Sequence, residues 1–344
     1  MKILVTGAAG FIGAKLSHCL AERGDEVIGL DNLNDYYDVR LKYARLAENG
    51  IVADGEFSAD IVYTSRLLSN LRFIRLSIDD KSSLDHLFEI EKFDKVINFA
   101  AQAGVRYSIT HPYSYMQSNL IGFLNILEAC RHFGVKHLIF ASSSSVYGMN
   151  EKVPFSEEDK VDTPVSLYGA SKKSNELMAH SYSKLYGFAV TGLRFFTVYG
   201  PWGRPDMAPF LFADAILAGK PIKIFNQGDM IRDFTFIDDI VEGTIKVVDS
   251  APIADQCPNQ VPYRIYNIGC GHPVKLMDFI QEIESAMGQT TEKVLLPMQS
   301  GDVYQTYADT SRLETEIGYH PHWDLHEGIE QFVAWYRSDK NPLN

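Results

Sequence analysis

Short apolar runs alternate with amphipathic stretches along the first half of the chain. Runs such as ILVT at 3–6 and HLIFA at 137–141 are uninterrupted, which is typical of strands buried on both faces of a sheet. Between these runs, apolar positions recur with the helical period. We therefore predict strands at 3–6, 27–30, 72–76, 95–99, 137–141 and 189–194, and helices at 11–23, 82–90, 114–133 and 167–186.

The pattern changes after about residue 200, where prolines separate shorter elements. The expected strands are 222–225, 264–268 and 294–296, and the expected helices are 210–218, 237–248, 275–287 and 325–336. Strands that alternate with helices predict a parallel sheet with helices on both faces, and ligands bind at the carboxyl ends of its strands. The predicted fold class is α/β: a Rossmann-type, doubly wound parallel sheet with a smaller mixed α/β substrate-binding lobe.

A strand, a glycine-rich turn and a helix start follow one another near the amino terminus. The turn has the spacing G-x-x-G-x-x-G, and its predicted cofactor-binding residues are Gly7, Gly10, Phe11, Ile12 and Gly13. Glycines let backbone N–H groups approach a pyrophosphate, and the helix N-terminus adds partial positive charge. Asp31 ends the second strand, where a carboxylate accepts hydrogen bonds from the adenine ribose and favours NAD over NADP. The alternative is that Asp31 is only a turn residue before Asn32.

These features predict an NAD-binding domain at 1–195. Residues 196–344 are then mainly the substrate-binding lobe, with some segments that return to the first domain. A long polar and aromatic stretch at 32–70 interrupts the alternation, and we predict an inserted helix and loops on the nucleotide side.

Composition narrows the class of protein. The net charge of -12 argues against general attraction to nucleic acid or to anionic membranes. The four cysteines, Cys19, Cys130, Cys257 and Cys270, lack metal-ligand spacing, so no metal is expected. Cys19 and Cys130 lie in helical patterns and are predicted to be buried free thiols. The first strand begins almost at Met1, and no apolar run is long enough for a bilayer. We therefore expect a cytoplasmic protein without a membrane or nucleic-acid partner.

Tyr168 and Lys172 are four residues apart at a predicted helix start and share one helix face. A nearby cation favours the phenolate and lowers the tyrosine pKa towards working pH. The spacing alone is weak evidence, because Tyr336 and Lys340 repeat it by chance near the C-terminus. The context is stronger: a strand and four serines at 142–145 precede Tyr168. A serine hydroxyl there can hydrogen-bond the substrate oxygen that the phenolate deprotonates, the alternative being a polar turn.

Eight segments, taken in order, resemble the extended short-chain dehydrogenase/reductase family, specifically its nucleotide-sugar epimerases and dehydratases. They are TGAAGFIG, Asp31-Asn32, FAAQAGVRYS, SSSSVYG, YGASK, RFFTVYGPWGRPDMA, IRDFTFIDD and GDVYQTYADTSRL, and they span residues 1 to about 313. The resemblance implies that Ser143, Tyr168 and Lys172 form a catalytic trio and that Lys172 also holds the nicotinamide ribose. The resemblance also implies that Tyr168 and Lys172 contact the cofactor. Further residues implied to bind the cofactor are Asn32, Asp79, Ala100, Gln102, Asn119 and Ser142.

The residues after Ser143 distinguish reaction classes within that family. Its 4,6-dehydratases have an Asp-Glu pair where this chain has Ser144 and Ser145, and its UDP-glucuronate decarboxylases have Glu at the second position. Serine does not supply acid–base chemistry at neutral pH. Both classes are therefore disfavoured, and an epimerase remains. In the expected mechanism Tyr168 takes the 4-hydroxyl proton, hydride passes from C4 to NAD, the 4-keto sugar rotates, and the hydride returns to the other face.

The resemblance also implies how a nucleotide sugar is held. Arg232 resembles the arginine that grips the diphosphate, and a guanidinium fork suits phosphate geometry. Asp302 resembles the carboxylate that binds the uridine ribose. The alternative for Arg232 is a surface ion pair with Asp233 or Asp229.

A cation near C6 would separate a uronate from a neutral hexose. Arg204, with the hydroxyls of Ser144, Ser145 and Thr197, is placed to hold a C6 carboxylate, the alternative being an exposed loop arginine. Arg106 is a second candidate cation, with the cofactor phosphates as its other potential partner. The GRPDMA and AGVRYS segments look like those of UDP-glucuronate 4-epimerases.

We therefore predict 4-epimerisation of UDP-glucuronate to UDP-galacturonate, with NAD as the cofactor. Two alternatives stay open: a UDP-glucose/UDP-galactose 4-epimerase, and a non-catalytic NAD-sensing protein on the same fold. The resemblance further implies a homodimer whose four-helix interface uses 114–133 and 167–186.

Overall fold

An eight-stranded sheet forms the centre of the computed structural model, which describes residues 1–59, 61–299 and 301–344. Its strand order is β11-β7-β6-β5-β1-β2-β4-β3, and neighbours are parallel except for the pair β3 and β4. The bounds are β1 Lys2–Thr6, β2 Glu26–Asp31, β3 Val62–Thr64, β4 Leu71–Arg75, β5 Lys95–Asn98, β6 His137–Ser143, β7 Ala189–Phe195 and β11 Tyr263–Ile268. The predicted α/β class is confirmed.

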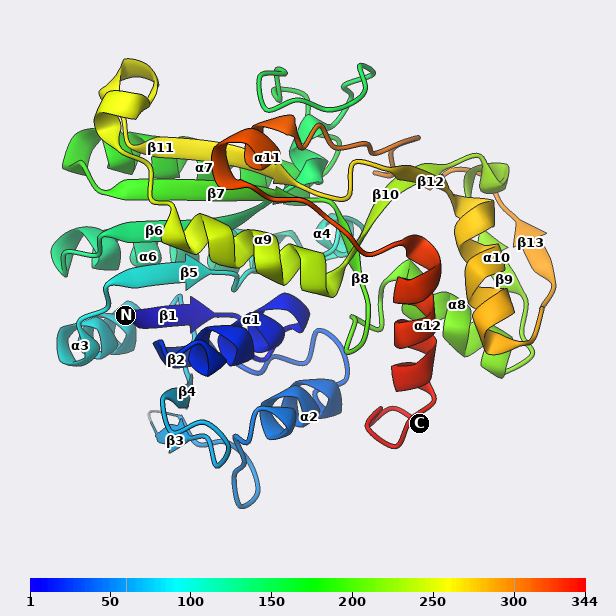
Figure 1. The fold of residues 1–344 in the computed structure, drawn as a ribbon, viewed down its shortest axis with the longest axis horizontal. Helices are drawn as coiled ribbons and strands as arrows, with labels where there is room; N and C mark the ends of the chain where they lie inside the picture. Colours follow the sequence, from blue (N-terminus) through cyan, green and yellow to red (C-terminus); the bar gives the residue numbers. More distant parts are fainter. Residues whose placement is uncertain (60, 300) are drawn as a thin grey trace.

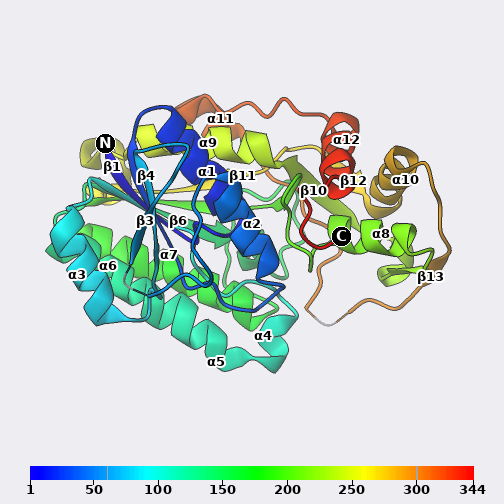
Figure 2. The same ribbon diagram turned by 90° about the horizontal axis from the view of Figure 1, so that it is seen from below.

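Helices cover both faces of this sheet, as Figures 1 and 2 show. One face carries α1 (Phe11–Glu22), α9 (Ile237–Asp249) and α11 (Ser311–Ile317), and the other carries α3 (Lys81–Glu91), α6 (Phe123–His132) and α7 (Leu167–Tyr186). Successive residues of a strand point to opposite faces. In β1, Ile3 and Val5 accordingly join the apolar cluster under α1 and α9, whereas Leu4 joins the cluster under α3 and α6.

A smaller lobe lies at the carboxyl ends of the strands (Figure 1). It contains the three-stranded sheet β12-β10-β8 and the pair β13-β9. Its strands are β8 Thr197–Tyr199, β9 Ile222–Ile224, β10 Ile231–Phe236, β12 Pro273–Lys275 and β13 Lys293–Leu295, and its helices are α8 Ala208–Leu217, α10 Leu276–Met287 and α12 Leu325–Tyr336. The remaining short elements are α2 Arg40–Glu48, α4 Tyr107–Thr110, α5 Pro112–Tyr115, η2 Ser144–Tyr147, η3 Asn226–Gly228, η4 Ala254–Gln256 and η5 Pro258–Gln260.

Two elements differ from the sequence pattern in an informative way. The helix predicted at 114–133 is divided, because a π-helical segment, η1 (Met116–Gly122), separates α5 from α6. π-helical segments often mark functional positions, and this one contains the buried Asn119. The strand predicted at 264–268 pairs with β7 as an edge of the main sheet, although it follows the change of pattern near residue 200.

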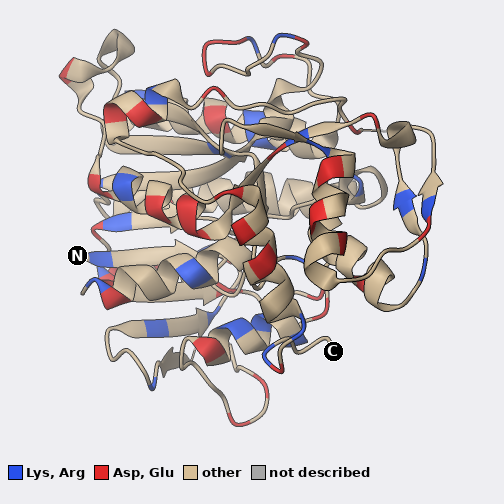
Figure 3. Ribbon diagram, turned by 45° about the vertical axis from the view of Figure 1, so that its right-hand side comes forward, with Lys and Arg blue, Asp and Glu red and all other residues tan. Residues whose placement is uncertain are grey.

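Surface charges are mixed: Figure 3 shows Asp and Glu on the outer helices with Lys and Arg among them. All four cysteines are free, and Cys130 and Cys257 are buried whereas Cys19 and Cys270 are half-buried. Within the described residues, none of the helices combines the length and the apolar character needed to cross a bilayer.

Candidate active site

A cavity of about 950 Å³ lies where the carboxyl ends of the main strands meet the smaller lobe. Its walls come from the glycine turn, the loop after β5, the end of β6, the start of α7 and the lobe loops. A cavity of this size at this edge is where open parallel sheets bind nucleotides.

The glycine turn forms one wall, and its shape requires glycine. Gly7 has φ +73°, and a Cβ on it would lie 2.9 Å from the backbone nitrogen of Ala100. A Cβ on Gly13 would lie 2.2 Å from the carbonyl oxygen of Gly7. The turn closes through a 2.9 Å hydrogen bond from the Gly10 N–H to the Gly7 carbonyl. Backbone packed this closely before α1 fits the pyrophosphate of a dinucleotide, and Phe11 and Ile12 also line the cavity.

Asp31 ends β2 beside this wall and is almost fully buried. Its carboxylate accepts the N–H of Ala9 at 3.2 Å and of Leu33 at 2.8 Å. The ammonium of Lys42, from α2, lies 3.6 Å away and donates to Asn34 at 2.8 Å. Asp31 is therefore both a turn residue and a wall of the cavity.

The other predicted cofactor residues divide into two groups. Asn32, Ala100, Gln102 and Ser142 line the cavity. Asp79 and Asn119 are not among its described lining residues. Asn119 instead supports the wall, because its amide accepts the Gln102 N–H at 2.8 Å and donates to the Gln102 carbonyl and to the Ser171 hydroxyl, both at 3.0 Å.

The start of α7 positions Tyr168 and Lys172. The Ser166 side chain caps the helix by accepting the Gly169 N–H at 3.1 Å. A Cβ on Gly169 would lie 2.6 Å from the Ser145 carbonyl oxygen, so glycine lets the helix approach the serine turn closely. Lys172 donates to the Ala141 carbonyl at 2.8 Å, and its nitrogen lies 5.9 Å from the centre of the Tyr168 ring.

Burial sets the acidity of both groups. It lowers the pKa of Lys172 to about 8. Burial raises the pKa of Tyr168, whereas a hydrogen bond with the Ser143 hydroxyl and the positive charge of Arg204 act in the opposite direction. The net shift is upward, so the lowering predicted from the neighbouring Lys172 is wrong for this structure, in which desolvation outweighs the opposing contributions. Ser143, Tyr168 and Lys172 thus line one wall together.

Arg232 lies on β10 across the cavity. Its guanidinium donates to the carbonyls of Ile231 at 2.8 Å, Tyr304 at 2.9 Å and Val303 at 2.7 Å. Burial lowers its pKa to about 10. The alternative ion pairs are absent from the described chain: Asp233 accepts backbone N–H groups, among them that of Cys270 at 2.8 Å, and Asp229 accepts the Tyr304 hydroxyl at 3.2 Å. A half-buried guanidinium whose hydrogen-bond acceptors among the described residues are carbonyls suits an anionic ligand.

Asp302 and Arg106 meet at the mouth of the cavity. Their side chains form an ion pair of 3.1 Å, and the Arg106 guanidinium lies 5.2 Å from the centre of the Phe225 ring. Both lining residues are therefore already partnered in this structure.

Arg204 lies in the wall and is not an exposed loop arginine, since only 22% of its side chain is accessible. Its Nε and Nη2 donate to Asp206 at 3.0 and 2.6 Å, and the Tyr36 hydroxyl donates to the same carboxylate at 2.9 Å. Ser144, Ser145 and Thr197 also line the cavity. The cation predicted from the sequence, Arg204, is present in the cavity wall, and its acidic partner, Asp206, was not predicted.

Residues 3–269 match the model of the NAD dependent epimerase/dehydratase family. The chain belongs to this family. The predicted NAD cofactor and the predicted epimerase class are thereby confirmed.

Named relatives and solved structures lie within the same family. The chain is 46% identical over 351 residues to UDP-glucuronate 4-epimerase 4 of Arabidopsis thaliana, covering 98% of this chain and 75% of the relative. It is 43% identical over 346 residues to a probable UDP-glucuronate 4-epimerase of Rhizobium meliloti (strain 1021), covering 98% and 97%. The UDP-glucuronic acid 4-epimerase of Bacillus cereus, solved with UDP-glucuronic acid and NAD, superposes with a TM-score of 0.84 at 34% identity, covering 97% and 98%. The UDP-glucose 4-epimerase of Thermotoga maritima, solved with UDP-glucose, gives 0.83 at 30%, covering 98% and 99%.

Among the cavity residues that were not predicted from the sequence are Tyr36, Lys42 and Asp206. Tyr36 and Lys42 lie in the stretch 32–70, whose polar and aromatic character was the one available signal. Asp206 stands two residues after Arg204, and this short spacing was the available signal for the ion pair between them.

Proposed function

We propose that this protein interconverts UDP-glucuronate and UDP-galacturonate by epimerisation at C4, with bound NAD and a transient 4-keto sugar. The observation that supports this most is the cavity wall itself. Ser143, Tyr168 and Lys172 line it together with Arg204, and serines occupy 144 and 145, where elimination or decarboxylation would need a carboxyl group. The names of the relatives and of the Bacillus cereus structure support the same reaction.

In this mechanism the protein moves one proton back and forth. NAD, when bound at the glycine turn and Asp31, supplies the acceptor of the C4 hydride and its return to the opposite face of the ring. The Tyr168 phenolate takes the proton of the 4-hydroxyl as the C4–H bond breaks and the C4=O bond forms. Ser143 donates a hydrogen bond to the same oxygen, and the Lys172 ammonium stabilises the phenolate. On the return step the phenol gives its proton back, so neither cofactor nor enzyme is changed.

Arg232 would bind the diphosphate of the UDP moiety. Its guanidinium has carbonyl partners but no carboxylate within 4 Å among the described residues, so its charge is available to bind a phosphate. Asp302 would accept the uridine ribose hydroxyls, and Arg106, its present partner, would then be able to turn towards a phosphate.

Arg204 and the hydroxyls of Ser144, Ser145 and Thr197 would hold the C6 carboxylate. A 4-keto uronate is a β-keto acid, and it loses CO2 when the breaking bond aligns with the carbonyl π system. A carboxylate held in the plane of the sugar disfavours that alignment. We expect UDP-galacturonate as the product, with no pentose formed.

One observation favours a second candidate, a UDP-glucose/UDP-galactose 4-epimerase. The pair Arg204–Asp206 has no net charge, and a neutral sugar needs none. NMR of the purified protein with UDP-glucuronate and no added NAD distinguishes the two and also tests for retained cofactor. Turnover of UDP-glucose but not of UDP-glucuronate would replace the first proposal with the second. Turnover of neither sugar would favour the non-catalytic NAD-sensing protein instead.

A homodimer forms part of the proposal. Apolar side chains are exposed on the outer face of α5, η1 and α7: Tyr113, Met116, Ile121, Leu177 and Leu185. Pairing of these helices with a second copy would bury them. Light scattering should show a dimer, and Leu177→Glu should shift it to the monomer. The cytoplasmic location and the division into 1–195 and 196–344 stay predictions.

A further inference from the structure

A buried polar network lies directly behind the wall that carries the predicted catalytic trio. Its centre is Glu176, on α7 one turn after Lys172 and two turns after Tyr168, so all three share one helix face. Glu176 is 3% exposed and is not among the residues that line the cavity. Glu176 itself therefore has no contact with a substrate and no part in the mechanism above, whereas Ser142 and Tyr147 of the same network line the cavity.

The Glu176 carboxylate is bound from two strands. Its Oε1 accepts the Ser142 hydroxyl at 2.7 Å and Nε of Arg194 at 2.8 Å, and its Oε2 accepts Nη2 of Arg194 at 2.9 Å. Ser142 immediately precedes Ser143 at the end of β6. The carboxylate thus ties the helix of Tyr168 to the strand of Ser143.

The same network reaches the other end of the serine segment. Nη1 of Arg194 donates to the Tyr147 hydroxyl at 3.0 Å, and that hydroxyl donates to Asn267 on β11 at 2.7 Å. Tyr147 closes the turn η2, which contains Ser144 and Ser145. Ser143 lies between the two anchored points in extended conformation, with φ -156° and ψ 148°.

From this geometry we propose that Glu176 is a positioning residue for the oxidation step. Through Ser142, Arg194 and Tyr147 it fixes the serine segment 142–147 relative to Tyr168 and Lys172. A buried ion pair is weak evidence of stabilisation, because desolvation offsets its Coulomb energy. Glu176, however, connects the strand of Ser143 to the helix of Tyr168 and Lys172. We therefore assign it a role in positioning these residues, in addition to any role in stability. This inference rests on the proposed function, since it concerns the transfer of hydrogen from C4.

The test compares Glu176→Gln, Ser142→Ala and Tyr147→Phe with wild type, using substrate deuterated at C4. Ser142→Ala removes one hydrogen bond and leaves the ion pair intact, so it stays informative if Glu176→Gln fails to fold. We expect kcat to fall roughly 10- to 100-fold with KM little changed, because small misplacement of reacting groups has effects of that size. The isotope effect on kcat should rise as hydrogen transfer becomes rate-limiting. NAD content of Glu176→Gln, measured after denaturation, should equal that of wild type, because Glu176 does not line the cavity.

The chain offers a matched control at the opposite edge of the sheet. Glu91 is also buried and accepts two hydrogen bonds from one arginine, Arg72, at 2.8 Å each. Glu91→Gln should lower the melting temperature while kcat and the isotope effect stay at wild-type values.

The outcomes separate the two proposals. If wild type epimerises a UDP-sugar but Ser142→Ala and Tyr147→Phe keep its kcat and isotope effect, Glu176 has only a structural role and the inference is wrong. If wild type epimerises no UDP-sugar, the proposed function fails before the variants are compared. Equal loss of kcat in Glu91→Gln would also overturn the inference, because the effect would then be general destabilisation.

Discussion

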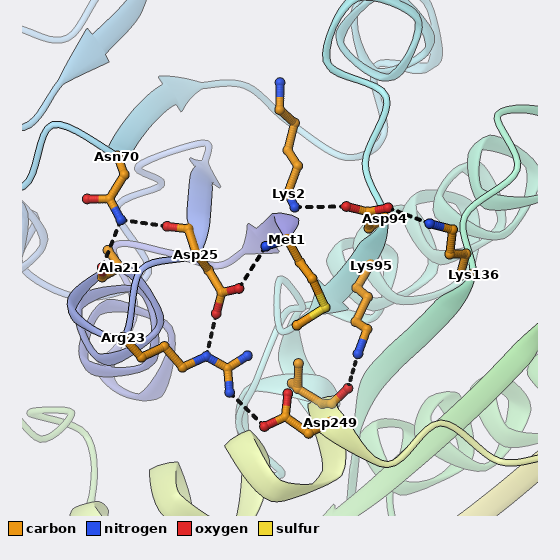
Figure 4. A network of polar contacts seen from close by, with 11 residues as sticks. Met1, Lys2, Ala21, Arg23, Asp25, Asn70, Asp94, Lys95, Lys136 and Asp249 are labelled. Carbon is orange, nitrogen blue, oxygen red and sulfur yellow. Dashed lines mark hydrogen bonds and ion pairs between the residues drawn. The ribbon is translucent and has the colours of Figure 1, made fainter.

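The cations at the two ends of the central sheet differ in their hydrogen-bond partners. At the amino ends of the strands, most cations in Figure 4 are paired with carboxylates, whereas Lys95 donates to the Val248 carbonyl at 2.6 Å. Arg23 donates to Asp249 at 2.8 Å and also binds Asp25, and Lys136 donates to Asp94 at 2.7 Å. Asp94 also accepts the Lys2 backbone N–H at 3.0 Å. These pairs join β1, β2, β5 and β6 at their starts and leave little charge for a ligand.

At the carboxyl ends, the buried Lys172 and the half-buried Arg232 lie beside the cavity and bind carbonyl oxygens instead. Neither has a carboxylate within 4 Å among the described residues. A carbonyl orients a cation without neutralising it, so the charge stays available to a phenolate or a phosphate. Burial of a cation without a counterion disfavours its charged form, which is consistent with the lowered pKa values of both residues. Lys172 and Arg232 thus keep their charge available to a ligand, although other cations of the cavity, such as Arg204, are paired with carboxylates.

The largest expected effect is at the phenol. Tyr168→Phe should reduce epimerisation by roughly 10²- to 10⁴-fold, since it removes the group that exchanges the proton. Turnover measured by NMR checks this. Tyr336→Phe is the control, because Tyr336 has the same spacing to a lysine but its hydroxyl binds Asp214 in the lobe. Normal turnover by Tyr168→Phe would rule out the mechanism.

Loss of a carbonyl-bound cation should weaken substrate binding. Arg232→Met removes the charge proposed for the diphosphate, and charged hydrogen bonds contribute about 1.5–3 kcal/mol. We expect KM for the UDP-sugar to rise roughly 10- to 100-fold, with a smaller change in kcat. An unchanged KM would remove Arg232 from the binding site.

Arg204 is the one cavity cation here with a bidentate carboxylate partner, so its effect should depend on the sugar. Arg204→Met should lower kcat/KM for UDP-glucuronate about tenfold, the scale of one charged hydrogen bond, and leave any activity on UDP-glucose nearly unchanged. Equal losses for both sugars would show that Arg204 acts on the chemistry and does not discriminate between sugars.

The smallest effect should come from the amino ends. Asp94→Asn should reduce the free energy of unfolding by about 0.5–1 kcal/mol, the range of partly exposed ion pairs, with normal turnover. The Lys136 ammonium and the Lys2 N–H hold the pKa of Asp94 below 3.8. The contribution of the carboxylate is thus fully present above pH 3.8 and is lost as pH falls through the folded value. Denaturant unfolding of both proteins at neutral and acidic pH should show the difference shrink; a constant difference would contradict this account.

Local pattern was sufficient for the elements and for part of the cavity. Short, largely apolar runs predicted six strands of the main sheet within one or two residues at each end, because burial on both faces leaves a strong local signal. The glycine turn was readable because a close backbone approach excludes every other residue. Tyr168 and Lys172 were readable because helical periodicity fixes their common face.

Contacts between distant segments were decided only by the tertiary structure. No local sequence pattern predicts the contact of Tyr36 with Asp206 or that of Glu176 with Ser142. The partners are far apart in sequence and meet only in the folded chain. The edge position of β11 has the same cause: a strand's length and polarity are local properties, whereas its neighbour is chosen by the whole sheet. The sequence by itself determined which groups of this protein are present, and the fold determined which of them have partners.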